Sequence, residues 1–241
     1  MKRGGVIFLW LLLSAVFLMT VQTLLAQKIK QNSASGAGQT STALPSTALP
    51  AITFDRLWSN FTPQSVTMTV SASGAGKYSS RNPEKTGDDV DDFQTEFTIS
   101  PAGRDKLFRD AKEASYFDGD FTFKKHVVAS TGKKTLSYSD PNRHFSTTYD
   151  YSENKAIQEI TSIFAGISNT IEHGRKLAFL HRFDKLGLEE ELKAMEDAAE
   201  SHTLAELQII RATLESIAQD STVLNIARQR AKKLLVKANS Q

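Results

Sequence analysis

Residues 152–171 read SENKAIQEITSIFAGISNTI, and this stretch separates a strand-rich part of the chain from a helix-rich part. Its large apolar residues recur at spacings of three and four, which places them on one face of an α-helix. Ser152 or Asn154 can cap the first turn. The positions on the apolar face are Ile157, Ile160, Ile163, Phe164, Ile167 and Ile171. The pattern continues to Phe183 and is broken at Gly187, and Gly174 is a candidate kink.

The chain before this helix carries short segments in which apolar and polar residues alternate, as in strands with one buried face. A first apolar segment begins at Ile52, and the others are 65–73, 93–100, 121–130, 134–139 and 143–151. Residues 74–90 are polar and predict a long loop, so strands 65–73 and 93–100 are expected to pair as a hairpin. Ser100-Pro101 predicts the capped start of one inserted helix that ends near Phe117.

Further helical patterns follow Gly187, and they are centred on apolar residues from Leu188, Leu204 and Val223 onward. The breaks between them are short, which predicts antiparallel neighbouring helices. The expected fold class is therefore α+β. A largely antiparallel sheet with one inserted helix occupies residues 51–151, and a C-terminal α-helical bundle in residues 152–241 packs on it.

An apolar run at residues 6–26, VIFLWLLLSAVFLMTVQTLLA, follows Lys2 and Arg3. Basic residues before such a run are typical of export signals. The run is a signal peptide cleaved after Ala26 or an uncleaved N-terminal hydrophobic helix, since about 20 apolar residues cross a bilayer core. Polar residues near its end favour cleavage, whereas Lys28 and its basic neighbours would suit an anchor.

Both interpretations place the rest of the chain outside the cytoplasm, as a periplasmic or secreted protein or as one anchored to the inner membrane. Residues 27–50 contain the pentapeptide STALP twice in tandem among small polar residues. Such a composition predicts a flexible linker. If the leader is not cleaved, the membrane is a partner through that segment.

Composition excludes several classes of function. The chain has no Cys, so disulfides, thiol chemistry and a lipid anchor on cysteine are all excluded. Lys and Arg number 29 against 27 Asp and Glu, and this near balance argues against a nucleic-acid-binding protein.

Glycine motifs resemble nucleotide-binding loops only in part. Gly132-Lys133 lacks both the upstream glycine and the following Ser or Thr of a P-loop, so a turn is the better interpretation. Gly74-Ala-Gly76 lacks a third glycine. Residues 166–170 lack the second glycine of a serine nucleophile elbow and lie inside the expected helix.

Acidic and histidine residues do not form a recognisable metal motif. Residues 88–92 are acid-rich but fit no EF-hand frame, and Asp118-Gly-Asp120 reads as a turn. His126 and His144 could meet across a sheet if both lie on strands. The remaining histidines form no i, i+4 pair, and they are His173, His181 and His202. We therefore predict no catalytic, cofactor-binding or metal-ligating residue.

The last helix is basic, with Arg228, Arg230 and several lysines up to Lys237 and no acid after Asp220. Cations near a helix C-terminus oppose its dipole, and contact with anionic lipid or an acidic partner is the functional alternative.

Three helix-forming segments, FDKLGLEEELKAME (183–196), LAELQ (204–208) and NIARQRA (225–231), resemble a group of uncharacterised exported bacterial proteins of unknown function. The resemblance spans roughly residues 52–238 and implies a bacterial exported protein without adding site residues. We expect a non-enzymatic envelope protein that binds another protein. The alternative is an extracytoplasmic hydrolase whose catalytic residues the sequence does not identify.

Overall fold

The computed structural model describes residues 49–82, 92–126 and 128–239. The predicted leader at 6–26 and nearly all of the predicted linker at 27–50 lie outside these residues. Within the described ranges, no helix combines the length and the apolar character needed to cross a membrane. The strands are β1 (Ala51–Leu57), β2 (Ser65–Ser71), β3 (Ala75–Arg81), β4 (Phe93–Thr98), β5 (Lys133–Asp140) and β6 (Arg143–Tyr149). The helices are α3 (Pro101–Glu113), α4 (Lys155–Phe183), α5 (Leu188–Glu200), α6 (Arg211–Gln219) and α7 (Asn225–Asn239), with short 3₁₀ turns η2 (Ser115–Phe117) and η3 (Leu207–Ile210).

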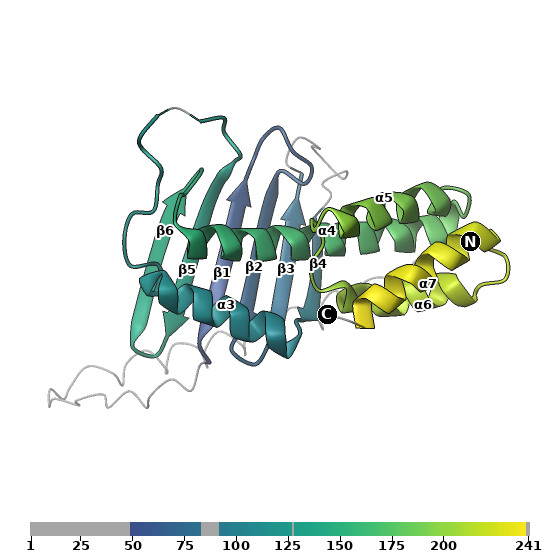
Figure 1. Cartoon of the computed structure of the whole chain (residues 1–241), viewed down its shortest axis with the longest axis horizontal. Coiled ribbons are helices and arrows are strands. Elements are labelled where there is room, and N and C mark those ends of the chain that lie inside the picture. Colours follow the sequence, from purple (N-terminus) through teal and green to yellow (C-terminus); the bar gives the residue numbers. More distant parts are fainter. Residues whose placement is uncertain (1–48, 83–91, 127, 240–241) are drawn as a thin grey trace, which may run out of the picture. The chain divides into compact units, whose positions relative to one another are not determined.

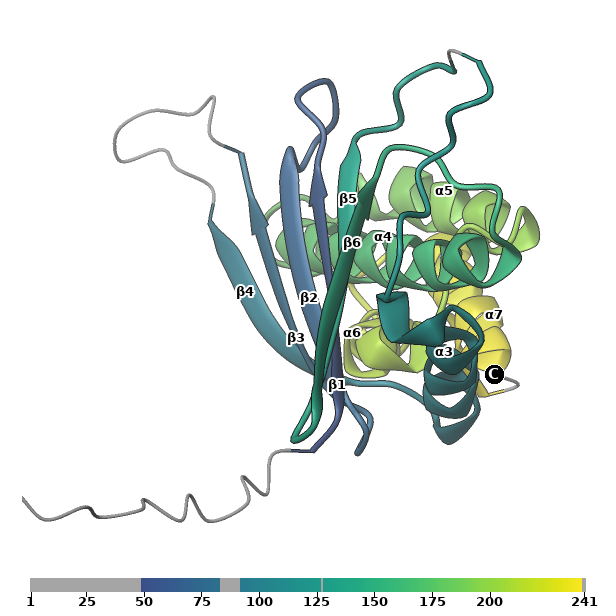
Figure 2. The same ribbon diagram turned by 90° about the vertical axis from the view of Figure 1, so that its left-hand side faces the viewer.

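The strands form one six-stranded sheet in the order β4-β3-β2-β1-β5-β6, and every neighbouring pair is antiparallel. Helix α3 and the first half of α4 lie across one face of this sheet (Figures 1 and 2). The second half of α4 extends beyond β4 and packs with α5 and α6, and these two helices pack with α7 (Figure 1). The predicted α+β class with a C-terminal helical bundle is confirmed.

The core between sheet and helices follows from the alternation in the strands. Phe54 in β1 has Met68 and Leu136 as its cross-strand partners, and all three side chains are buried. The Phe54 ring stacks on Phe164 of α4 with centroids 5.2 Å apart. Burying large apolar side chains from both layers is the main driving force for this packing.

Strand β3 occupies part of the segment that the sequence predicts as a loop, and it separates β2 from β4. The expected hairpin between 65–73 and 93–100 is therefore wrong. The inward positions of β3 include Gly76 and Ser80, so the strand lacks an apolar alternation. A Cβ on Gly76 would lie 2.5 Å from the Phe97 ring of β4, so the glycine leaves room for that ring.

The predicted strand at 121–130 is also wrong, because the described residues there are not in a strand. Phe123 instead packs its ring edge-on against Tyr151 and His126. His126 is thus not on the sheet, and the premise for a meeting with His144 fails. His144 contacts Ser139, with its Nδ1 3.0 Å from the serine Oγ.

Both predicted helix caps are present. Ser100 accepts the Gly103 N–H at the start of α3, and Asn154 accepts the Ile157 N–H at the start of α4. Helix α4 continues through Gly174 to Phe183. A Cβ on Gly174 would lie 2.3 Å from Ile210, so this glycine permits the close approach of η3.

Candidate functional site

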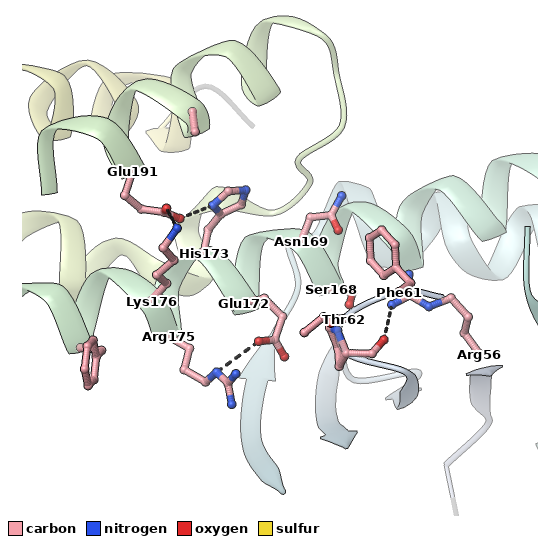
Figure 3. A pocket seen from close by; sticks show the side chains of 13 residues that line it. Arg56, Phe61, Thr62, Ser168, Asn169, Glu172, His173, Arg175, Lys176 and Glu191 are labelled. Carbon is pink, nitrogen blue, oxygen red and sulfur yellow. Dashed lines mark hydrogen bonds and ion pairs between the residues drawn. The ribbon is translucent and has the colours of Figure 1, made fainter. Parts of the chain in front are cut away.

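A cleft of about 690 Å³ opens between the β1–β2 loop, the middle of α4 and the start of α5. Its volume lies in the range of small-ligand pockets, roughly 300–1,000 Å³. Figure 3 shows Arg56, Phe61 and Thr62 at one end, and His173, Lys176 and Glu191 at the other. The lining residues are Arg56, Phe61, Thr62, Pro63, Ser168, Asn169, Glu172, His173, Arg175, Lys176, Phe179, Glu191 and Ala194.

Arg56 is a buried cation at the sheet end of the cleft. The alternation of β1 turns its side chain to the same face as Ile52 and Phe54, and only 9% of it is exposed. Its Nη2 donates to the Pro63 carbonyl across 3.5 Å, and the guanidinium lies 4.9 Å from the centre of the Phe61 ring. Its Nε has no hydrogen-bond partner among the described residues.

The electrostatic surroundings of Arg56 are unfavourable to its charge. Burial lowers the pKa of the guanidinium below its usual value, and nearby Tyr78 and Glu172 offset part of this effect. Its cross-strand partner is another cation, Lys134, which is also buried.

Lys134 differs from Arg56 in being fully surrounded by acceptors. Its Nζ donates to the carbonyls of Thr131, Gly132 and Asp150 at 3.0, 2.9 and 2.8 Å, and to the Thr131 hydroxyl at 2.8 Å. Buried charges in proteins are normally satisfied in this manner. The hydrogen-bond donors of Lys134 are satisfied in this way, whereas those of Arg56 are not.

Glu172 lies in the middle of the cleft and is held by three donors. Its Oε1 accepts hydrogen bonds from the Tyr78 and Ser80 hydroxyls, each at 2.7 Å, and its Oε2 lies 3.1 Å from Arg175 Nε. Burial raises the pKa of the Tyr78 hydroxyl, and the neighbouring Glu172 carboxylate raises it further. The Tyr78 hydroxyl therefore stays protonated and donates to the Glu172 carboxylate.

Glu191, a residue of α5, lies at the other end of the cleft, and only 4% of Glu191 is exposed. His173 Nδ1 lies 2.6 Å from its Oε1, and Lys176 Nζ lies 2.5 Å from its Oε2 (Figure 3). Burial alone would raise the pKa of this carboxyl, but the bonds to His173 and Lys176 outweigh burial and lower it.

An exposed aromatic pair borders the cleft on α4. Phe179 and Phe183 are 59% and 63% exposed, and their ring centroids lie 5.0 Å apart. Leu186, just beyond the helix, is 74% exposed. Of these three, Phe179 lines the cleft, and an exposed aromatic side chain in the wall of a pocket is typical of binding surfaces.

Of the glycine and serine motifs, the one at Gly132 lies away from the cleft, whereas the segment 166–170 contributes Ser168 and Asn169 to its lining. Gly132 precedes strand β5 rather than the helix of a P-loop, and its φ of +87° is one that glycine favours. The segment 166–170 lies inside α4, as expected, and Ser168 Oγ is 3.3 Å from the Tyr78 hydroxyl.

The acidic candidates do not form a metal site. Asp120 is exposed and pairs with Lys124 at 2.5 Å, and this bond lowers the pKa of Asp120 to about 2. Of residues 88–92 only Asp92 is described, and it pairs with Arg81 at 2.9 Å. No group of His, Cys, Asp and Glu within the described ranges is arranged to hold a metal ion.

The basic last helix contributes to the bundle. Arg230 of α7 forms ion pairs with Glu189 and Glu196 of α5. This cation therefore ties two helices together, a role that neither the dipole interpretation nor the lipid interpretation includes.

Sequence reasoning missed the cleft because its residues come from segments more than 100 positions apart. One signal was available: Arg56 occupies an inward position of an alternating strand after Ile52 and Phe54. A cation at such a position either finds buried partners or marks a site.

No protein-family model matches this chain, and no curated protein matches it either. The resemblance to uncharacterised exported bacterial proteins therefore stays a prediction from the sequence.

Proposed function

We propose that this chain is an exported bacterial envelope protein that binds a ligand or a partner protein in the cleft without transforming it. Export rests on the predicted leader at residues 6–26. Binding rests on the cleft, and one observation carries the argument against catalysis. Both lining carboxylates, Glu172 and Glu191, are already bonded to neighbouring side chains.

A hydrolase needs a general base with a free lone pair aimed at water or at a nucleophile. Each Glu172 oxygen already has a donor or a cationic partner. Each Glu191 oxygen is close to one of two basic side chains. The low pKa of Glu191 further reduces its strength as a base. These bonds fix the shape and the charge of a binding site.

The rim supports the same function. Phe179 lines the cleft, and Phe183 continues the apolar surface along α4. Aromatic side chains next to a charged pocket supply contact area at low entropic cost, which is how many binding sites gain affinity.

A variant that fills the cleft tests the binding function. Ala194 is exposed and lines the cleft, so Ala194→Trp should block it without disturbing the core. The neighbouring Lys193 is exposed but does not line the cleft, so Lys193→Trp is the matched control. Both variants and the wild type would be used for affinity capture from native envelopes with quantitative mass spectrometry of proteins and small molecules.

The proposal expects at least one bound species that the wild type and Lys193→Trp retain and Ala194→Trp loses. Identical bound species for all three proteins would contradict it. Export is tested separately by fusing alkaline phosphatase, which is active only outside the reducing cytoplasm, behind Gln241. An inactive but stable fusion would contradict the envelope assignment.

A further inference from the structure

We propose that the cleft recognises a carboxylate attached to an apolar group, and that Arg56 is the cation that anchors the carboxylate. This inference rests on the proposed binding function of the same cleft and adds the chemical class of the ligand. It starts from the unmet hydrogen-bonding capacity of Arg56.

A guanidinium has five N–H donors and stays charged at any physiological pH. In the described part of the chain, Arg56 donates one long bond of 3.5 Å, to the Pro63 carbonyl, and its Nε donates none. No carboxylate in that part lies within 4.0 Å of it in an ion pair, although Glu172 is near enough to influence its charge. Its Nε is enclosed by protein atoms, so the donors left for an acceptor that the fold does not supply are those of the two Nη atoms, on a side chain that is 9% exposed.

The other charges of the cleft favour a single negative charge over a phosphate. Arg175 is paired with Glu172, and Lys176 is paired with Glu191. Two lining carboxylates oppose three lining cations, so the surplus is about one positive charge. A planar carboxylate matches the fork of one guanidinium, whereas a phosphate dianion would need a second free cation.

The remaining walls indicate what the carboxylate is attached to. Phe61 and Pro63 contact Arg56, and Phe179 and Ala194 are the further apolar residues that line the cleft. Figure 3 shows the Phe61 ring beside the guanidinium at the sheet end. A ligand whose acid group meets Arg56 therefore extends along apolar surface, as an aromatic or aliphatic acid does.

The probe is N-acetylphenylalanine, and its uncharged control is N-acetylphenylalanine amide. Binding would be measured by ¹H–¹⁵N NMR titration of the full mature chain. The acid should bind with a Kd of roughly 1 mM or tighter, as a ligand of this size can in such a cleft. The amide should bind about 10- to 100-fold more weakly, since a hydrogen-bonded charge pair is lost. Equal binding of the two compounds, or no binding of the acid, would overturn the proposal.

Two variants separate Arg56 from general effects. Arg56→Met should lose the preference for acid over amide, and Arg109→Met should keep it, because Arg109 is an exposed residue of α3 that does not line the cleft. Arg56→Lys keeps the charge but not the fork, so it should restore part of the preference. An unchanged preference in a folded Arg56→Met protein would overturn the proposal.

The carboxylate could come from a free organic acid or from the C-terminus of a peptide. A tetrapeptide ending in Phe, as the free acid and as the amide, distinguishes the two sources. Affinity that rises with the added residues indicates a peptide, and affinity that stays constant indicates a small acid. If the Ala194→Trp capture experiment succeeds while both acids fail, only the carboxylate inference is wrong and the binding function stands.

Discussion

Replacing Arg56 with Met should leave the fold about as stable as the wild type or more stable, although only 9% of Arg56 is exposed. A buried donor without a hydrogen-bond partner lowers the stability of a protein by about 1–3 kcal/mol. Arg56→Met removes that penalty. It also removes a like-charged neighbour of Lys134. The change loses a long hydrogen bond, about 0.5 kcal/mol, and a contact with the Phe61 ring, about 1 kcal/mol.

The sum predicts a free energy of unfolding between about 0.5 kcal/mol lower and about 1.5 kcal/mol higher than that of the wild type, and the upper limit is about 5 °C in Tm for a chain of this size. Lys134→Met is the matched control, because it makes the same change on the adjacent strand. Lys134→Met leaves the carbonyl oxygens that accept from Lys134 Nζ without this donor, so it should destabilise the protein by at least about 2 kcal/mol.

Urea unfolding followed by circular dichroism measures both variants. A loss of more than about 1.5 kcal/mol for Arg56→Met would mean that Arg56 is a structural residue with good internal partners. Its donors would then not be available to a ligand. If Lys134→Met leaves the free energy of unfolding unchanged, the hydrogen bonds of a buried cation do not determine its contribution to the stability of this protein.

Three further predictions concern the fold around the cleft. Gly76→Ala should cost about 1–3 kcal/mol in thermal unfolding, because its Cβ would meet the Phe97 ring at 2.5 Å; no loss would show that the ring moves freely. Glu191 has a lowered pKa in the folded state, so its contribution is complete above the unfolded value of 4.5 and is lost as pH falls below it. Glu191→Gln should therefore flatten the acid limb of the stability profile measured between about pH 3 and 6, and an unaltered limb would contradict the pairing. Ser100→Ala removes the cap that accepts the Gly103 N–H and should cost about 0.5–2 kcal/mol in urea, whereas an unaffected midpoint would argue that the cap is dispensable.

The helices could be predicted from the sequence because their signals are local. Spacings of three and four predicted α4, Ser100 predicted the start of α3, and Ser152 or Asn154 predicted the start of α4, where the structure has Asn154 as the cap. The strand at 75–81 was missed because its inward positions are Gly76, Tyr78 and Ser80, which pack well but do not alternate in hydrophobicity.

The prediction of a strand at 121–130 is wrong for the opposite reason. The segment carries the alternation of a strand, yet Phe123 finds its contacts in Tyr151 and His126 outside the sheet. The alternation of apolar residues predicts which side chains are buried, but it does not predict which element covers them. The cleft could not be predicted at all, because Arg56, Glu172 and Glu191 meet only through the crossing of α4 over the sheet and the return of α5.

The Nε–H resonance of Arg56, which the Arg56→Lys variant identifies by its disappearance, tests the central claim most directly. Titration with N-acetylphenylalanine should shift this resonance, because a carboxylate bound to the Nη atoms changes the charge distribution of the whole guanidinium, while the matching amide leaves it in place. If the acid binds and the Arg56 resonance does not move, the anchor is another group and the account of this cleft is wrong.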